Sequence, residues 1–307
     1  MTIGHREIAA GERTLKHPSP FSTATLLTGG ADASGEWLVL LNHYDVDAAI
    51  DPYVERAIKA YRDAGADVVL ITTGADDDAL GRLHPRLIHV VRKSRNDDLR
   101  DFGGWHHALE QLGSEVLGRY ARVILTNDSV YFPVRPAGPL LAALRSSDAD
   151  VFAATDSVSG GRYHLQSYFL AFAPRALDLF RPELARRVAE QAEGTKLTLV
   201  QRFEVGLSEF LIGAGMTTEV FVALHDIPDL SAAMSPPDPR RFSRLAATVL
   251  NVTHQLWRTT LARELPFLKV ELLRDNPVAV DIDGWEAMVD GPCGADLIAA
   301  HLARVRR

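Results

Sequence analysis

The sequence predicts an α/β protein with a largely parallel sheet flanked by helices. Short apolar runs that suit buried strands alternate with amphipathic segments of helical length. The composition agrees, since 47% of the 307 residues are hydrophobic and 24% are charged, values typical of a globular chain with a core. We expect one main domain at 36–250, an irregular lead-in at 1–35, and a helical extension at 251–307 packed on the same domain.

The expected elements follow one another in a regular order. The first helix begins at Asp51 and Pro52, with Asp51 as its cap, and ends at Gly65. Ligands of parallel sheets bind beyond the carboxyl ends of the strands, so the loops there are the candidate site. Expected strands cover 37–41, 67–73, 87–91, 122–126, 151–155, 166–172 and 219–223, and further helices cover 105–117, 140–145, 176–194 and 203–213.

Charge and cysteine content exclude some classes of protein. The net charge of −7 argues against nucleic-acid binding, which needs a basic face. Cys293 is the only cysteine, which permits no internal disulfide and fits a reducing cytosol. No signal peptide is apparent, and no apolar run approaches the ~20 residues of a membrane helix. We expect a cytoplasmic protein. The mixed apolar and basic segment 251–274 fits either contact with the inner face of the membrane or a packed helix.

The loop after the first strand suits a nucleoside. His43, Tyr44 and Asp45 follow the apolar run directly. An aromatic ring can stack on a base while a carboxylate accepts from ribose hydroxyls. For Asp45, helix capping is the alternative.

The loop after the third strand resembles an anion site. Four cations lie within 92–100, and Gly103 and Gly104 precede the expected helix. Backbone N–H groups at a helix start attract phosphate, and arginine can bind it bidentately. Arg95, Asn96, Asp101 and Gly103 are therefore candidate anion-binding residues, the alternative being a solvated charged loop.

The loop after the fourth strand contains Asn127 and Asp128. A carboxylate here can hold Mg²⁺ or Mn²⁺ beside a diphosphate. The second acid of an Asp-x-Asp pair is missing, so the sequence leaves a divalent metal open, and Asp128 could instead cap the next turn.

Further polar residues lie later in the chain. Asp156 follows the fifth strand, and Glu204 opens a helix where it could act as a general base. His164 and Gln166 are further candidate site residues, although His164 equally fits a hydrogen-bonded strand histidine.

An ordered set of segments resembles the rhamnan synthesis protein F family. The matching stretches are HYDVDAAIDPYV (43–54), RNDDLRDFGGW (95–105), ILTNDSVYFP (124–133), HLQSYFLAF (164–172), FEVGLS (203–208), THQLWR (253–258) and PFLKVELLRDNP (266–277). The stretch DDLRDFGGW departs from the Asn-x-Gly-Tyr-Asp-Phe-Gly pattern expected there, which leaves the role of Asp98 open.

The resemblance implies a GT-A-like glycosyltransferase that builds rhamnose-containing cell-surface polysaccharide. The implied donor is a nucleotide sugar, often dTDP-L-rhamnose, which the candidate residues after the first, third and fourth strands (His43, Tyr44, Asp45, Arg95, Asn96, Asp101, Gly103, Asn127 and Asp128) would bind. The implied acceptor is a growing or lipid-linked glycan, which His164 and Gln166 would contact. It implies transfer with inversion, with Glu204 as the first choice of base and Asp156 as the second. Lys269 and His254 would assist the leaving diphosphate, and His254 is a further candidate metal ligand with Asp128.

Two alternatives remain. Asp45 and Asp47, with Thr72 and Thr73 at the end of the next strand, partly match an aspartyl phosphatase of the haloacid dehalogenase kind. The incomplete Asp-x-Asp pair also fits a non-catalytic scaffold of a polysaccharide assembly complex.

Overall fold

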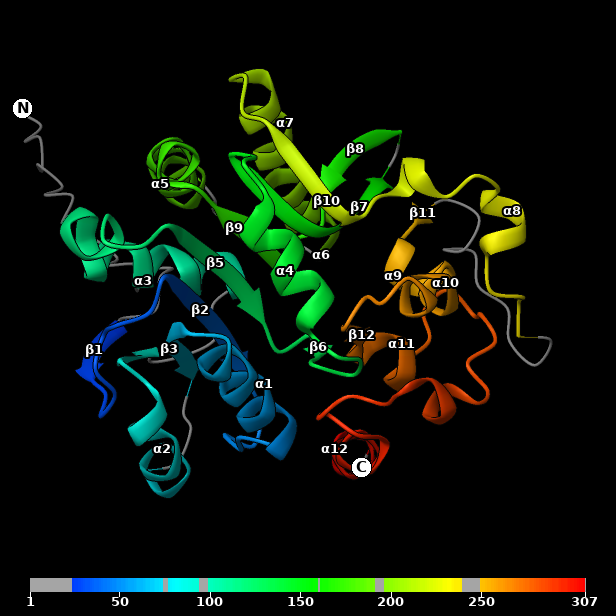
Figure 1. Cartoon of the computed structure of the whole chain (residues 1–307), viewed down its shortest axis with the longest axis horizontal. Coiled ribbons are helices and arrows are strands. Elements are labelled where there is room, and N and C mark those ends of the chain that lie inside the picture. Colours follow the sequence, from blue (N-terminus) through cyan, green and yellow to red (C-terminus); the bar gives the residue numbers. More distant parts are fainter. Residues whose placement is uncertain are drawn as a thin grey trace, which may run out of the picture.

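A mixed sheet with helices on both faces forms the centre of the molecule (Figure 1). The computed structural model describes residues 24–73, 77–93, 99–159, 161–190, 196–238 and 249–306. The predicted α/β class is confirmed.

The strands of the main sheet follow the order β1-β4-β3-β2-β5-β9-β7-β10, with β8 and β11 pairing to β7. The pairs β2–β3, β3–β4, β2–β5 and β7–β10 are parallel, whereas β9 runs antiparallel to both β5 and β7. A separate two-stranded sheet pairs β6 with β12. The bounds are β1 (Ala24–Thr28), β2 (Trp37–Tyr44), β3 (Ala66–Thr73), β4 (His89–Lys93), β5 (Arg122–Asn127), β6 (Val130–Tyr131), β7 (Val151–Ser159), β8 (Arg162–Leu165), β9 (Phe169–Phe172), β10 (Thr218–Val222), β11 (Val249–Leu250) and β12 (Leu268–Lys269).

Helices cover the sheet on two sides because the strands are apolar on both faces. One core contains side chains of α1, α2, α4 and the C-terminal segments, and the other contains side chains of α3, α5 and α7. The bounds are α1 (Pro52–Asp63), α2 (Asp77–Leu83), α3 (Arg100–Leu117), α4 (Gly138–Ser146), α5 (Pro174–Glu190), α6 (Lys196–Leu199), α7 (Gly206–Gly213), α8 (Leu230–Ala233), α9 (Val252–Gln255), α10 (Trp257–Ala262), α11 (Val270–Arg274) and α12 (Ala295–Val305), and a π-helix, η2 (Val200–Val205), leads into α7.

The structure corrects several boundaries. Residues 24–28, expected to be irregular, form β1, which pairs with β4 along the edge of the sheet. The strand expected at 166–172 begins only at Phe169, because 166–168 form a turn between it and the separate strand β8 at 162–165. The C-terminal extension contains the strand β12 as well as helices.

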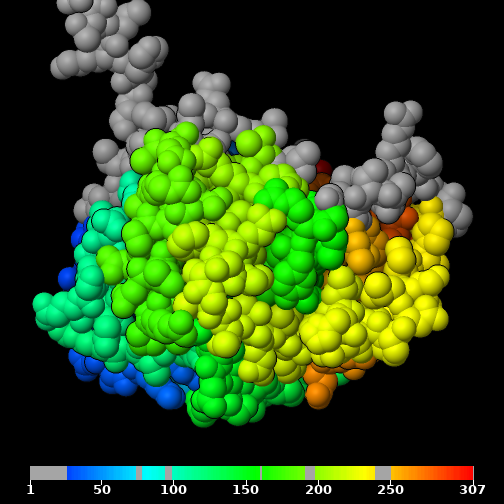
Figure 2. Space-filling model, turned by 90° about the horizontal axis from the view of Figure 1, so that it is seen from above, coloured from blue at the N-terminus to red at the C-terminus, as the bar shows by residue number. Residues whose placement is uncertain are grey.

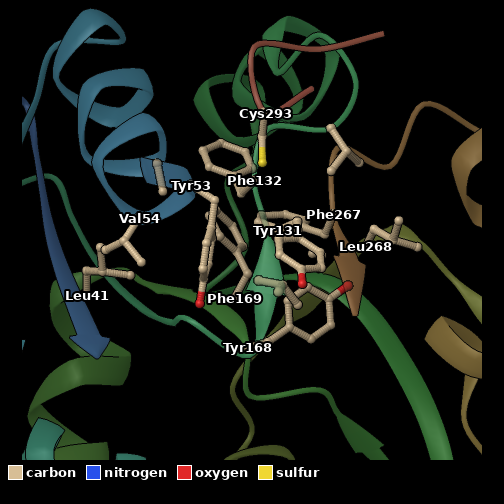
Figure 3. Close-up of a cluster of buried hydrophobic side chains, with 14 of the residues drawn as sticks. Leu41, Tyr53, Val54, Tyr131, Phe132, Tyr168, Phe169, Phe267, Leu268 and Cys293 are labelled. Carbon is tan, nitrogen blue, oxygen red and sulfur yellow. The ribbon is translucent and has the colours of Figure 1, made fainter. Parts of the chain in front are cut away.

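The C-terminal extension is part of the core. Phe267 packs on Phe132, Tyr168 and Phe169, which come from two segments of the main domain (Figure 3). The apolar side chains proposed as a membrane contact are 0–2% exposed, so they cannot enter a lipid surface from this structure, and the packed-helix interpretation of 251–274 holds. These side chains are Leu256, Trp257, Leu261, Phe267 and Leu268.

Figure 2 shows the side of the molecule formed by α5 and α7, with the green surface of β7 and β8 next to the yellow segment around α8. In the part of the chain that is described, no helix combines the length and apolarity needed to cross a bilayer.

Candidate donor site at the carboxyl ends of β2 and β5

Asp101 joins the ends of two neighbouring strands. Its Oδ1 accepts a hydrogen bond from Asn42 Nδ2 of β2 at 2.6 Å, and its Oδ2 accepts from Asn127 Nδ2 of β5 at 2.8 Å. The paired amides hold the first turn of α3 against the edge of the sheet where the parallel strands end. Sequence reasoning placed these side chains near one another but did not predict this clamp.

Glycine permits the close approach of α3 to β2. A Cβ atom at Gly104 would lie 2.0 Å from Asn42 Oδ1 and 3.2 Å from a methyl group of Ile71. The helix begins at Arg100 rather than at Trp105, so Gly103 and Gly104 lie inside it. The Gly103 N–H donates to the Leu99 carbonyl at 3.4 Å. The glycines therefore lie inside the helix and not in a loop before it, which corrects the expected position of the helix start. The anion site expected in 92–100 stays a prediction, because 94–98 lie outside the described residues.

A chain of polar contacts continues from Asn127 to β12. Ser129 Oγ donates to Asn127 Oδ1 at 2.5 Å and accepts from Lys269 Nζ at 3.1 Å. Lys269 also lies over the ring of Tyr168, 4.7 Å from its centroid. The cation predicted to face the diphosphate is thus held beside the end of β5 by a segment 140 residues away in sequence.

The carboxylates of Asp101 and Asp128 lie near one another at this edge of the sheet, and their charged forms are disfavoured there. Burial raises the pKa of Asp128 well above its usual value, and the nearby Asp101 raises it further. Burial also raises the pKa of Asp101, although Asn42, Lys93 and Lys269 act in the opposite direction. The Asp128 side chain remains 14% exposed and accepts from the Tyr44 N–H at 2.9 Å. This pair would be stabilised by a cation or by a hydrogen-bond donor of a ligand.

His43 and Tyr44 occupy opposite environments at the end of β2. His43 Nδ1 lies 3.0 Å from Thr72 Oγ1, and burial lowers the pKa of His43 to about 4. The ring is neutral at pH 7, so its Nε2, 3.9 Å from Asp128, makes no ion pair there. Tyr44 is 45% exposed, and its ring is available to stack on a base.

Asp45 is engaged with Arg304 of α12. The guanidinium contacts both oxygens of Asp45, at 3.2 and 2.5 Å, and also contacts Asp51. Asp51 stands at the N-cap position of α1 but makes no capping bond, so the expected cap is wrong: its carboxylate turns to Arg304. Nothing in the local sequence pointed to Arg304, because its partners lie more than 250 residues earlier.

Glu204 lies in the π-helix η2, a distortion frequent at functional sites. Its Oε1 accepts from the N–H and the hydroxyl of Ser167, at 2.8 and 2.6 Å. Phe203 stacks on Phe102, the residue after Asp101, with ring centroids 4.9 Å apart. The candidate base is thereby anchored next to the helix turn that carries Asp101.

The other acceptor-side candidates are buried. Asp156 is 1% exposed, and burial raises its pKa although the Leu224 N–H binds it at 2.7 Å. Gln166 accepts from Thr155 Oγ1 at 2.7 Å and donates to Asn251 at 3.1 Å. His164 is also buried. Contact of these side chains with an acceptor requires a rearrangement.

The predicted metal and anion ligands are only partly placed. Arg95 and Asn96 lie outside the described residues. His254 is buried on α9, which packs against β12. Across the described ranges, no group of three or more His, Cys, Asp or Glu side chains could hold a metal ion. Asp128 offers a single carboxylate, so a metal here would take other ligands from the bound diphosphate.

Fold and site together define an α/β protein with an acidic and amide-rich site at the carboxyl ends of β2 and β5. A family model described as rhamnan synthesis protein F matches residues 75–222. The predicted resemblance to this family is confirmed over that stretch, which includes Asp101, Asp128 and Glu204.

Other comparisons cover part of the chain. The virulence protein VirA of Vibrio anguillarum is 30% identical over 195 residues, which cover 58% of this chain and 60% of that protein. Solved structures with partial likeness include the glycosyltransferase GlyE of Streptococcus pneumoniae (TM-score 0.45, 9% identity, 89% of this chain and 64% of that one). The galactosyltransferase LgtC, solved with donor and acceptor sugar analogues, has a TM-score of 0.36 at 14% identity, over 60% of this chain and 72% of that one. A mannosyltransferase of Pyrobaculum calidifontis, solved with GDP-mannose and Mn²⁺, has a TM-score of 0.32 at 14% identity, over 54% and 50%.

Proposed function

We propose that this protein is a glycosyltransferase that binds a nucleotide sugar at the carboxyl ends of β2 and β5. One observation carries the proposal: the exposed ring of Tyr44, the costly pair of Asp101 and Asp128, and the Lys269 ammonium adjoin one edge of the sheet. These groups match the three parts of a nucleotide-sugar donor. The tyrosine ring can stack on the base, a carboxylate can bind the sugar hydroxyls, and the lysine ammonium can bind the diphosphate. The match to the rhamnan synthesis protein F model supports the same reading.

The donor-binding roles follow from the contacts. Tyr44 stacks on the base, and Asp128 binds a ribose hydroxyl. Asp128 would also be the residue that holds a divalent metal, Mg²⁺ or Mn²⁺, whose charge would offset that of the diphosphate. Lys269 neutralises charge on the leaving diphosphate, an effect that typically carries a large share of the rate. Asp101 and Asn127 position Asp128 rather than contact the donor, because their mutual hydrogen bond fixes the loop that carries Asp128.

The chemical step is a single displacement with inversion. The acceptor hydroxyl oxygen attacks the anomeric carbon, the bond from that carbon to the diphosphate oxygen breaks, and the hydroxyl proton passes to Glu204. Ser167 holds one carboxylate oxygen of Glu204 and so orients the group. Asp156 is the second choice because its burial shields it from a sugar.

By resemblance to the family, the donor is dTDP-L-rhamnose and the acceptor is a cell-surface or lipid-linked glycan, reached at the cytoplasmic face of the membrane. The alternative of an aspartyl phosphatase is disfavoured by Asp45. Both oxygens of that carboxylate are bound by Arg304, and a nucleophile needs an accessible oxygen.

Donor turnover tests the proposal. The protein is incubated with dTDP-rhamnose, UDP-glucose or GDP-mannose, each with EDTA or with Mn²⁺, and free nucleoside diphosphate is measured over time with and without a rhamnan acceptor. We expect dTDP release that depends on the acceptor and is lost in Asp128→Ala. Absence of release from every donor, or phosphate release from simple phosphoesters that is lost in Asp45→Asn, would overturn it.

A further inference from the structure

The C-terminal helix is tied to the loop that carries Tyr44 by one side chain. Arg304 of α12 donates from Nε to Asp51, from Nη1 to Asp45 and Asp47 at 3.2 and 3.1 Å, and from Nη2 to Asp45 and Asp51. These bonds use the full donor fork of a guanidinium. In Figure 1, α12 (red) lies beside the start of α1 (blue), and the two helices are in contact.

Asp45 transmits this contact to the loop backbone. Its Oδ1 accepts from the N–H groups of Asp47 and Ala49, at 2.9 and 3.1 Å, as well as from Arg304. Between these two residues, Ala48 adopts a positive φ of 59°, a conformation that an alanine occupies only when its surroundings hold it there. Four hydrogen bonds reach the two oxygens of Asp45, three on Oδ1 and one on Oδ2, which equals the roughly four acceptor sites of a carboxylate.

The loop ends at the candidate donor site. Tyr44 immediately precedes Asp45, and its N–H binds Asp128. A second path runs from α12 to the same place. His301 Nδ1 lies 2.8 Å from the Tyr131 hydroxyl, its ring packs on Tyr53, and the Tyr53 hydroxyl donates to the Asp128 carbonyl at 3.2 Å.

We propose that Arg304 is a positioning residue that holds the 44–51 loop in the conformation that binds the nucleoside, with Asp45 as the tie between them rather than as a ribose ligand. The nature of the ligand rests on the function proposed above. Such a residue acts equally on the ground state and the transition state, since the base does not change during transfer. Its loss should therefore raise the Kd for nucleotide and the KM for donor and leave kcat nearly unchanged.

The experiment compares Arg304→Ala and Arg304→Lys with Arg306→Ala, a control at the C-cap of the same helix. The Arg306 guanidinium binds the Leu273 carbonyl, and no bond from it to these carboxylates is seen among the described residues. Hydrogen exchange of the peptide covering 44–51 reports on the loop without any ligand. Calorimetry with dTDP and donor kinetics report on binding. We expect Arg304→Ala to accelerate exchange in 44–51 while the strands stay protected. The Kd should rise by roughly 10–100-fold, the range found when a group that orients a binding residue is lost.

Arg304→Lys should recover only part of the effect, because an ammonium cannot bind two carboxylates bidentately. Unchanged exchange in Arg304→Ala, or the same changes in Arg306→Ala, would overturn the proposal. Should Arg304→Ala not fold, Asp45→Asn replaces it with the same expected signature. If the wild-type protein binds no nucleotide, the proposed function fails, and the exchange data alone still decide whether Arg304 orders the loop.

Discussion

Gly104 is the most exacting position in the contact between α3 and the sheet. A methyl group there would meet Asn42 Oδ1 at 2.0 Å, well inside a normal contact distance. Asn42 cannot yield freely, because its amide is bound to Asp101 at 2.6 Å and its side chain is buried. Gly104→Ala therefore forces α3 away from β2 or breaks the Asn42–Asp101 hydrogen bond.

The size of the effect follows from these two outcomes. A hydrogen bond to a charged group contributes about 1.5–3 kcal/mol, and overpacking a core typically costs about 1–3 kcal/mol. The better helix propensity of alanine returns roughly 1 kcal/mol. The two costs less this gain lower the free energy of unfolding by about 1.5–5 kcal/mol, and the midpoint of thermal unfolding by roughly 3–15 °C.

Urea and thermal unfolding of Gly104→Ala measure this loss, with Gly81→Ala as the matched control. Gly81 lies in α2 with no atom within 4 Å of an added Cβ, so its replacement should stabilise the protein by about 0.5–1 kcal/mol. Nucleotide affinity should fall in Gly104→Ala alone. If Gly104→Ala is as stable as the wild type, the close contact between α3 and β2 is refuted.

Three further predictions concern the carboxylates. Asp128→Asn should weaken donor binding but raise stability at neutral pH. The folded-state pKa of Asp128 is raised, so the charged carboxylate destabilises the fold. The stability gained in Asp128→Asn should therefore shrink as the pH falls and the wild-type carboxylate becomes protonated. Urea unfolding at a series of pH values measures this gain, and a gain that does not change with pH would contradict the prediction. Glu204→Gln should keep the fold, because the amide oxygen can still accept from Ser167. It should slow single-turnover transfer by about 10²–10⁴-fold. A near-normal rate would show that Glu204 is not the base, and a collapse of the rate in Asp156→Asn would make Asp156 the base. The free energy of unfolding of Asp45→Asn should fall less at acid pH than that of the wild type. The pKa of Asp45 is below its usual value because Arg304 and loop N–H groups outweigh its burial, so its contribution is present above the usual carboxyl pKa and disappears as the pH falls through the lowered one; identical acid profiles would contradict this.

The sheet was predictable because its strands have a clear local sequence pattern. Runs such as WLVLL and DVVLITT are continuous apolar segments bounded by polar loops, and they form β2 and β3. The start of α3 was misplaced because two glycines disfavour a helix by propensity, whereas here they lie inside one that packs closely on Asn42. Tertiary contact overrides propensity at this point.

The site was predictable only in outline. The sequence placed Asp101, Asn127 and Asp128 at the same edge of the sheet, and the structure brings them together there; that this edge binds a ligand stays a prediction. Pairings between distant segments carry no local signal, so the clamp of Asp101 and the tie from Arg304 to Asp45 emerged only from the structure. The apolar residues of 251–274 fitted both a membrane contact and a packed helix, because sequence alone does not show that they are buried against the main domain.

The central claim is that a nucleotide sugar binds where β2 and β5 end. Calorimetric titration of the protein with dTDP and UDP, each with and without Mn²⁺, tests it most directly. The matched variants are Tyr44→Ala, which removes the exposed ring, and Tyr163→Ala, which removes an exposed tyrosine ring elsewhere, on β8. We predict saturable binding of at least one nucleotide that Tyr44→Ala weakens and Tyr163→Ala leaves intact. Absence of binding by every nucleotide, or equal loss in both variants, would contradict the account.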